Sequence, residues 1–191
     1  MPPSSACLTL VVPSLAATHA VAGALASVSR PGDVLVLAGD MGAGKTAFAQ
    51  GFGRALGVTE PITSPTFTLV HTYDTHAGPL HHADIYRLDQ LAEVADLALG
   101  ELAEFNGIVL VEWGDVVSAA LGEHLEVRLQ VVDDPDDPQA EEVGNDVEDD
   151  DSDVLPTTRE IRITPSGSSW ARRWGTISEL IGSIDVAGAE T

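Results

Sequence analysis

One stretch constrains the fold more than any other. It consists of an apolar run, VLVLA at 34–38, followed by the glycine-rich GDMGAGKT and then by a helical pattern. The run has the length of a strand and no polar residue, which is typical of a strand covered on both faces of a sheet. The loop matches G-x-x-x-x-G-K-[ST] through Gly39, Gly44, Lys45 and Thr46. Strand, glycine loop and helix in this order are the context in which the motif binds nucleotide phosphates. We therefore predict an α/β fold with a phosphate-binding loop.

Each position of the motif has a physical reason. Glycines let backbone N–H groups turn toward phosphates, and the start of the helix near Thr46 adds a partial positive charge. Lys45 is the only lysine of the chain, and its ammonium suits the β- and γ-phosphates. The hydroxyl of Thr46 can ligate Mg²⁺. A fortuitous glycine turn is the alternative interpretation.

A second acidic group is needed near such a loop to hold or orient the metal. The apolar run IVLVE at 108–112 predicts another buried strand, and it ends in Glu112. We predict that Glu112 ligates the metal directly or through water. The alternative is an acidic residue that ends a strand beside Trp113.

The segment HADIYR places His82, Asp84 and Tyr86 on one face of a strand by its period of two. Ile85 and Arg87 then lie on the other face. A carboxylate at Asp84 could position the attacking water, so Asp84 is a candidate catalytic residue. We interpret Arg87 as structural. The histidines of this region match no structural zinc pattern.

Periodicity and turn signals predict the remaining elements. Further strands are expected at 8–12, 66–73, 80–88, 125–131 and 160–163, and helices at 15–28, from Thr46 to Gly57, at 89–105 and at 168–184. The strands at 66–73 and 80–88 form a hairpin with a longer loop. The last two strands form a C-terminal β-hairpin.

The charge of the chain is strongly negative. It has 9 basic and 30 acidic residues and a formal net charge of -21. Residues 133–153 hold 12 of the acidic residues, so that 18 acidic and 9 basic residues, a charge of -9, remain outside this stretch. We predict that 133–157 is a disordered acidic insertion within a single domain spanning 1–191. Direct binding to nucleic acid is disfavoured by this charge.

The cysteine content and the N-terminal sequence indicate the cellular compartment of the protein. Cys7 is the only cysteine, so no intrachain disulfide can form and a reducing compartment is expected. The apolar N-terminal stretch lacks a charged beginning, and no apolar run reaches about 18 residues. We expect a cytoplasmic protein without a membrane partner.

Four segments, GDMGAGKT, ITSPTFTLV, HADIYRL and VLVEWGD, occur in an order and at separations that resemble the TsaE (YjeE) family. Its members are small ATPase subunits of the bacterial machinery that installs threonylcarbamoyl on adenosine 37 of tRNA. The resemblance runs from Thr18 to the strand at 125–131. It implies a P-loop NTPase-like sheet flanked by helices, bound ATP or ADP with Mg²⁺, and partners of the TsaD and TsaB type. It also implies that tRNA is met only through those partners.

The resemblance assigns roles residue by residue. Asp84 and Glu112 are the catalytic candidates, Thr46 and Glu112 the metal ligands, and Ser64-Pro65-Thr66 a switch-like loop near the γ-phosphate. The nucleotide-binding set implied by the family is Asp40, Gly42, Ala43, Gly44, Lys45, Thr46, Ala47, Ser64, Thr66 and Trp113.

Three departures from the family pattern leave questions open. Ala47 replaces a frequent second hydroxyl, Ala22 replaces a frequent glycine of the early helix, and the acidic insertion interrupts the region of a later nucleotide contact. Two other functions also stay open from the sequence. One is a P-loop small-molecule kinase, although the segment 133–153 contains no arginine or lysine to serve as a lid. The other is a nucleotide-sensing module without useful hydrolysis.

Overall fold

The structure is a computed structural model, and it describes residues 6–65, 68–86, 99–104, 106–115, 118, 121–132 and 158–184. Its strands are β1 (Leu8–Val12), β2 (Val34–Ala38), β3 (Val70–Tyr73), β4 (Leu80–Asp84), β5 (Ile108–Glu112), β6 (His124–Val131) and β7 (Arg159–Ser166). Its helices are α1 (Leu15–Val28), α2 (Lys45–Ala55), α4 (Leu99–Glu104) and α5 (Ser168–Gly182).

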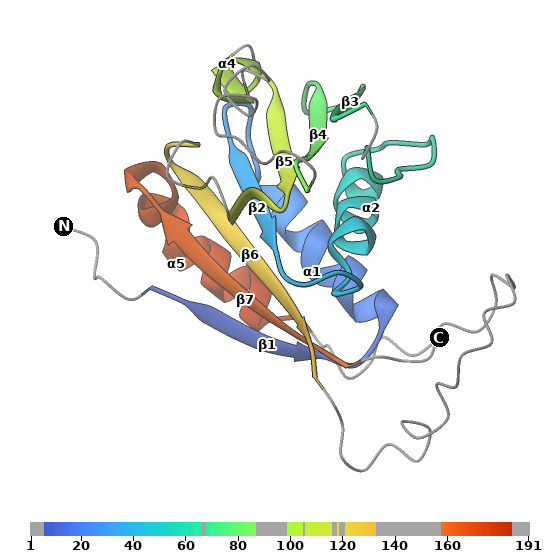
Figure 1. Ribbon diagram of the computed structural model, residues 1–191. Coiled ribbons are helices and arrows are strands. Elements are labelled where there is room, and N and C mark those ends of the chain that lie inside the picture. Colours follow the sequence, from blue (N-terminus) through green and yellow to red (C-terminus); the bar gives the residue numbers. More distant parts are fainter. Residues whose placement is uncertain are drawn as a thin grey trace, which may run out of the picture.

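The seven strands form one mixed sheet in the order β1-β7-β6-β2-β5-β4-β3 (Figure 1). β2 runs parallel to both of its neighbours, β5 and β6, and β4 runs parallel to β5. The pairs β1–β7, β6–β7 and β3–β4 are antiparallel. β2 therefore lies inside the sheet, buried over its whole length, and directs the glycine loop to the ends of its parallel neighbours.

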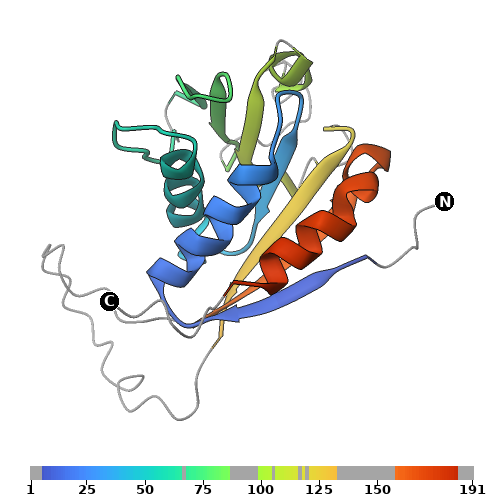
Figure 2. The ribbon, with the colours of Figure 1, turned by 180° about the vertical axis from the view of Figure 1, so that it is seen from behind.

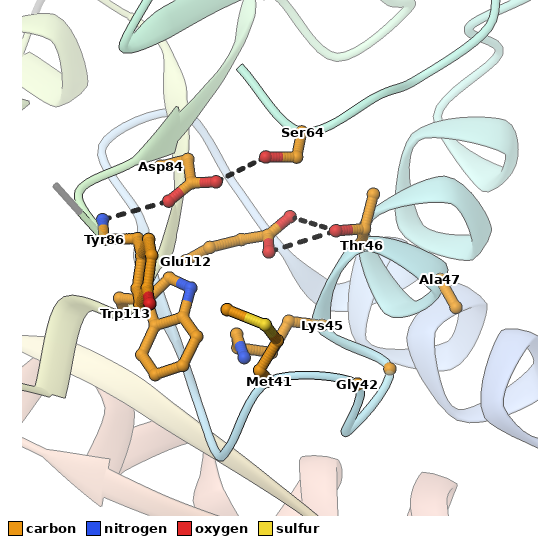
Figure 3. A pocket seen from close by; sticks show the side chains of 11 residues that line it. Met41, Gly42, Lys45, Thr46, Ala47, Ser64, Asp84, Tyr86, Glu112 and Trp113 are labelled. Atoms are coloured by element: carbon orange, nitrogen blue, oxygen red, sulfur yellow. Dashed lines mark hydrogen bonds between the residues drawn. The ribbon is translucent and has the colours of Figure 1, made fainter. Parts of the chain in front are cut away.

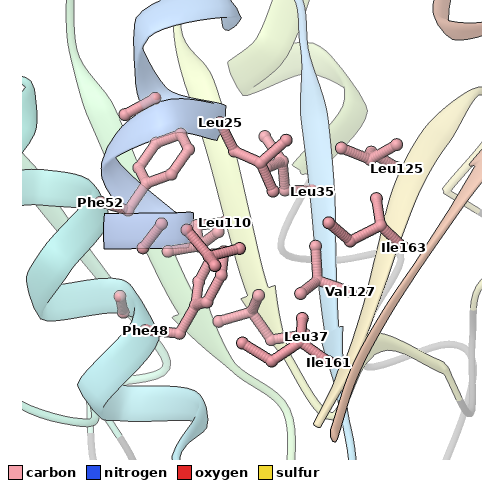
Figure 4. Packing of buried hydrophobic residues seen from close by; sticks show 14 of the residues in the cluster. Leu25, Leu35, Leu37, Phe48, Phe52, Leu110, Leu125, Val127, Ile161 and Ile163 are labelled. Carbon is pink, nitrogen blue, oxygen red and sulfur yellow. The ribbon is translucent and has the colours of Figure 1, made fainter. Parts of the chain in front are cut away.

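Helices α1, α2 and α5 form one layer on the same face of the sheet (Figure 2). The larger core fills the space between this layer and the sheet (Figure 4). After Trp170 of α5, the largest fully buried side chains there are Phe48 and Phe52 of α2, which lie beside the leucines of β2 and β5. A smaller core lies on the opposite face, where Leu99 and Ala103 of α4 join apolar residues of β2, β4 and β5. These two cores explain why β2 and β5 contain only apolar residues before Glu112.

Helices α1 and α5 both begin at a side chain that accepts their free N–H groups. Ser14 Oγ accepts a hydrogen bond from the N–H of Ala17 at 3.2 Å. At the start of α5, the carboxylate of Glu123 accepts the N–H groups of Ser168 at 2.7 Å and of Ser169 at 3.1 Å. The carboxylate of Glu123 thereby satisfies donors that a helix start leaves without an intrahelical partner.

Helices α1 and α2 approach each other closely at Gly51. A Cβ atom added to Gly51 would lie 2.8 Å from the Cα atom of His19 and 2.9 Å from its Cδ2 atom. Any side chain at this position would therefore push the two helices apart.

Several predicted boundaries are confirmed, including 8–12, 15–28, 34–38 and 108–112. The predicted strand 66–73 is wrong at its start, because Leu69 has a φ of 64° and its N–H donates to the carbonyl of Pro65 at 2.7 Å. The predicted strand 80–88 is too long, since β4 ends at Asp84. The helix predicted to end at Gly57 ends at Ala55.

Other predicted segments lie wholly or partly outside the described residues. They comprise residues 66–67, most of the helix at 89–105, and the acidic segment 133–157 between β6 and β7. In the part of the chain that the structure describes, no helix is both long and apolar enough to cross a membrane.

Candidate functional site

The glycine loop turns from the end of β2 into the start of α2 through three residues with positive φ. Gly39, Gly42 and Gly44 have φ angles of 130°, 80° and 100°, which L side chains rarely adopt. Gly39 also lies against β6, since an added Cβ atom would come within 2.1 Å of the carbonyl oxygen of Leu129. The backbone path of the loop therefore requires glycine at these positions.

Lys45 is the first residue of α2 and is only 5% exposed. Its Nζ donates to the carbonyl oxygens of Gly39 at 2.8 Å and of Asp40 at 2.7 Å, and it lies 3.7 Å from the ring centroid of Trp113. Burial lowers the pKa of Lys45, while the negative charges of Glu112 and other nearby carboxylates act against that shift. The ammonium group is thus already positioned inside the loop.

Thr46 and Glu112 meet although 66 positions separate them in the sequence. The Thr46 hydroxyl lies 2.9 Å from Glu112 Oε1 and 3.1 Å from Oε2. Glu112 is 2% exposed, and its Oε1 also lies 2.9 Å from Nε2 of His82. The carboxylate is therefore held from two sides, by the first turn of α2 and by β4.

Asp84 comes from the end of β4, where it pairs in register with Glu112 of β5. Its Oδ2 accepts a hydrogen bond from the Ser64 hydroxyl, and its Oδ1 accepts the N–H of Tyr86 at 3.0 Å. Two neighbouring parallel strands thus end in carboxylates that point to the same space.

These groups line one cavity of about 440 Å³ at the ends of β2, β4 and β5 (Figure 3). The lining residues are Met41, Gly42, Gly44, Lys45, Thr46, Ala47, Ser64, Asp84, Tyr86, Glu112 and Trp113. The rings of Tyr86 and Trp113 lie 4.8 Å apart and form one wall. Positive and negative groups therefore converge on a volume large enough for a small charged ligand.

Most residues assigned to the site from the sequence line this cavity, but two do not. Asp40 is exposed and takes part through its carbonyl, whereas Ala43 is buried beneath the loop. Thr66 and Arg87 lie outside the described residues. Ala22 is buried in the core between α1 and the sheet.

Arg159, at the start of β7, contacts the glycine loop although the sequence did not predict it. Its Nε donates to the carbonyl of Ala43 at 3.0 Å, and a Cβ atom added to Gly44 would lie 2.8 Å from the same nitrogen. Burial lowers the pKa of Arg159. No motif identified this arginine, because it follows the acidic segment and reaches the loop only through the pairing of β7 with β6.

His82 lies on the predicted face of β4, and its contact with Glu112 is a second feature that the sequence did not predict. Met41 and Tyr86 are further lining residues that the sequence reasoning assigned no role in binding. The alternation of the strand HADIYR was the one signal that could have indicated His82 and Tyr86.

Comparisons with known proteins show the family to which the chain belongs. The family model described as Threonylcarbamoyl adenosine biosynthesis protein TsaE matches residues 12–140. A Bacillus subtilis (strain 168) relative named tRNA threonylcarbamoyladenosine biosynthesis protein TsaE is 44% identical over 115 residues, which are 60% of this chain and 70% of the relative. A relative of the same name from Nostoc sp. (strain PCC 7120) is 48% identical over 88 residues, which are 44% of this chain and 54% of that relative.

A solved structure gives the same result for the fold. The crystal structure of YdiB from Bacillus subtilis is similar with a TM-score of 0.65 and 30% sequence identity, over 92% of this chain and 94% of YdiB. The family match spans the glycine loop, Asp84 and Glu112, and it covers more than half of the chain. The resemblance seen in the sequence is thus confirmed, and the chain belongs to the TsaE family of threonylcarbamoyl adenosine biosynthesis proteins.

Proposed function

We propose that this protein is an ATP-binding and ATP-hydrolysing subunit required for threonylcarbamoyl modification of adenosine 37 in tRNA. Its hydrolysis supports turnover of a transferase complex. One observation carries the proposal: Lys45, Thr46, Asp84 and Glu112 line a single cavity at the glycine loop, in a chain that belongs to the TsaE family.

The loop is built to receive the phosphates of ATP or ADP. Its backbone N–H groups at 42–47 precede or open α2, where the partial positive charge of a helix start favours anions. Lys45 would exchange its two carbonyl contacts for β- and γ-phosphate oxygens. Since burial lowers the pKa of Lys45, a bound polyphosphate would raise it again and hold the charged form. These contacts would match those of a phosphate-binding loop that holds a nucleoside triphosphate.

The residues present fit Mg²⁺. Thr46 and Glu112 offer a hydroxyl and a carboxylate oxygen, the hard ligands that Mg²⁺ prefers. Among the described residues no cluster of three or more His, Cys, Asp or Glu forms a metal cage, and Mg²⁺ usually takes few protein ligands together with phosphates and water. Bound there, Mg²⁺ would neutralise charge that develops on the phosphates during hydrolysis.

Asp84 and Glu112 are the candidates that orient the attacking water. The hydrogen bonds that Asp84 receives from Ser64 and Tyr86 fix the direction of its carboxylate, which favours a role in positioning. Because Ser64 belongs to the proposed switch-like loop 64–66, movement of this loop on nucleotide binding would change the contact with Asp84. The ammonium group of Lys45 lies over the ring of Trp113.

The chemistry on tRNA is assigned to partners of the TsaD and TsaB type. A net charge of -21 repels a phosphate backbone, which supports contact with tRNA only through those partners. We infer that the chain acts in the cytoplasm as one P-loop domain.

Two substitutions test the proposal. Lys45→Ala and Glu112→Ala should each abolish Mg²⁺-dependent ATP hydrolysis, measured in single turnover with and without the transferase subunits. Arg162→Ala is the matched control, because Arg162 lies on the exposed face of β7 and pairs with Glu160.

Undiminished hydrolysis in both site variants would refute the assigned site. Transfer of phosphate to a small acceptor without any reaction of water would favour a kinase. Nucleotide binding without hydrolysis, even in the assembled complex, would favour a sensing module.

A further inference from the structure

His82 is the most completely buried titratable residue beside the cavity. Its side chain is 0% exposed, and the adjoining side chain of Glu112 is 3% exposed. His82 pairs in register with Leu110 of β5, two positions before Glu112. β4 therefore places the imidazole next to the carboxylate at the end of the neighbouring strand.

The chemistry of the two groups defines the direction of their hydrogen bond. A carboxylate only accepts hydrogen bonds, so Nε2 of His82 must carry the hydrogen and its N–H donates a hydrogen bond to Glu112 Oε1 at 2.9 Å. Oε1 then accepts hydrogen bonds from both His82 and Thr46, whereas Oε2 contacts only the Thr46 hydroxyl, at the longer distance of 3.1 Å. Glu112 Oε2 is thus the oxygen with more remaining capacity to bind a ligand.

We propose that His82 is a positioning residue that fixes Glu112 for metal-dependent nucleotide binding. This inference rests on the proposed function and assigns His82 a part in it. The imidazole anchors Oε1, so that Oε2 and the Thr46 hydroxyl face the space where Mg²⁺ would bind. Without this anchor the Glu112 side chain could rotate away from Thr46, because the Thr46 hydroxyl alone would then hold it.

If His82 only filled space in the core, an imidazole would be an unfavourable side chain for this position. Its Nδ1 has no hydrogen-bond partner within the described residues, and burying such an atom costs free energy. An apolar side chain would fill the same space without that cost. The neighbouring His81 faces the other side of the sheet, where its Nδ1 lies 2.9 Å from the Thr72 hydroxyl, and it provides a matched control.

The test compares two amides that differ in reach. The amide nitrogen of His82→Gln comes near the position of Nε2, whereas that of His82→Asn comes near the position of Nδ1 and cannot reach Glu112. Binding of ADP is measured by calorimetry in the full chain, with Mg²⁺ and with a chelator. The Mg²⁺-dependent gain in affinity should fall about tenfold in His82→Asn, as expected when a group that orients a metal ligand is lost.

The remaining expectations separate positioning from folding. In the presence of the chelator, the affinity of His82→Asn for ADP should stay within about twofold of that of the unaltered chain. His82→Gln should recover most of the Mg²⁺-dependent gain in affinity, because its amide can donate to Glu112. His81→Asn should resemble the unaltered chain with and without Mg²⁺. Near-ultraviolet circular dichroism checks that each variant is folded.

Three results would overturn the inference, and they are distinguishable. Equal losses with and without Mg²⁺ in both His82 variants would make His82 a structural residue. An unchanged Mg²⁺ effect in folded His82→Asn would show that Glu112 needs no anchor. Failure of the unaltered chain to bind ADP or ATP would remove the proposed function itself, and the role of His82 with it.

Discussion

Replacing Gly51 by alanine tests how closely α1 and α2 pack beneath the glycine loop. In an open helix position the change from glycine to alanine gains about 1 kcal/mol in helix propensity. At Gly51, however, the new Cβ atom would lie 2.8 Å from the backbone Cα atom of His19, and a backbone atom cannot rotate away. Overpacking of this kind costs about 1–3 kcal/mol, occasionally more.

The expected net result for Gly51→Ala is therefore a loss of stability of up to about 2 kcal/mol. Gly175→Ala is the matched control, because Gly175 also lies inside a helix, α5, and its added Cβ atom would meet nothing within 4 Å. That variant should gain up to about 1 kcal/mol. In a chain of this size each kcal/mol shifts Tm by about 2–4 °C.

The assay is thermal unfolding followed by circular dichroism at fixed protein concentration without nucleotide. Gly51→Ala should unfold several degrees below Gly175→Ala, with the unaltered chain between them. An equal rise of Tm in both variants would refute the close contact between α1 and α2. Since α2 begins at Lys45, a separation of the helices should also weaken ADP binding in Gly51→Ala alone.

Two further predictions concern a helix start and the underside of the loop. Hydrogen bonds from the Ser168 and Ser169 N–H groups lower the pKa of Glu123 in the folded protein. The ionised Glu123 therefore stabilises the fold above the pKa of an unfolded glutamate, about 4.3, and this stabilisation is lost as the pH falls through the lower pKa of the folded state. Glu123→Gln should accordingly lower Tm at pH 7 and much less at pH 3. The control is Glu179→Gln, a change inside helix α5. A difference in Tm that does not depend on pH would contradict this reasoning. Arg159→Met removes the donor to the Ala43 carbonyl, so it should lower the free energy of unfolding in urea by about 1–2 kcal/mol and weaken ADP binding. The control Arg162→Met should change both quantities little. Equal effects of the two substitutions would argue against a special contact at the loop.

Short sequence patterns were sufficient to predict much of the fold and several residues of the site. The loop, Glu112 and Asp84 could be predicted because each follows or ends a strand that its own residues are sufficient to identify. The strands β2, β4 and β5 run parallel, so their carboxyl ends meet at one edge of the sheet. A motif at the end of each strand is then sufficient to place the residues together.

The contacts of Arg159 and His82 could not be predicted in the same way. Arg159 reaches the loop because β7 pairs with β6 and β6 pairs with β2, an order that does not follow the sequence. The contact of His82 with Glu112 depends on the register of β4 against β5. Strand order and register arise from packing across the whole sheet, and no single segment encodes them.

The position of Lys45 has a chemical consequence for labelling. It is the only lysine of the chain, and burial both lowers its pKa and limits access to it. A lower pKa increases the fraction of neutral amine, which is the form that reacts with acylating reagents. Apart from the α-amino group, an amine-directed probe therefore has one nitrogen to modify. Acylation of Lys45 therefore measures whether the cavity is open, and a bound phosphate would protect its amine.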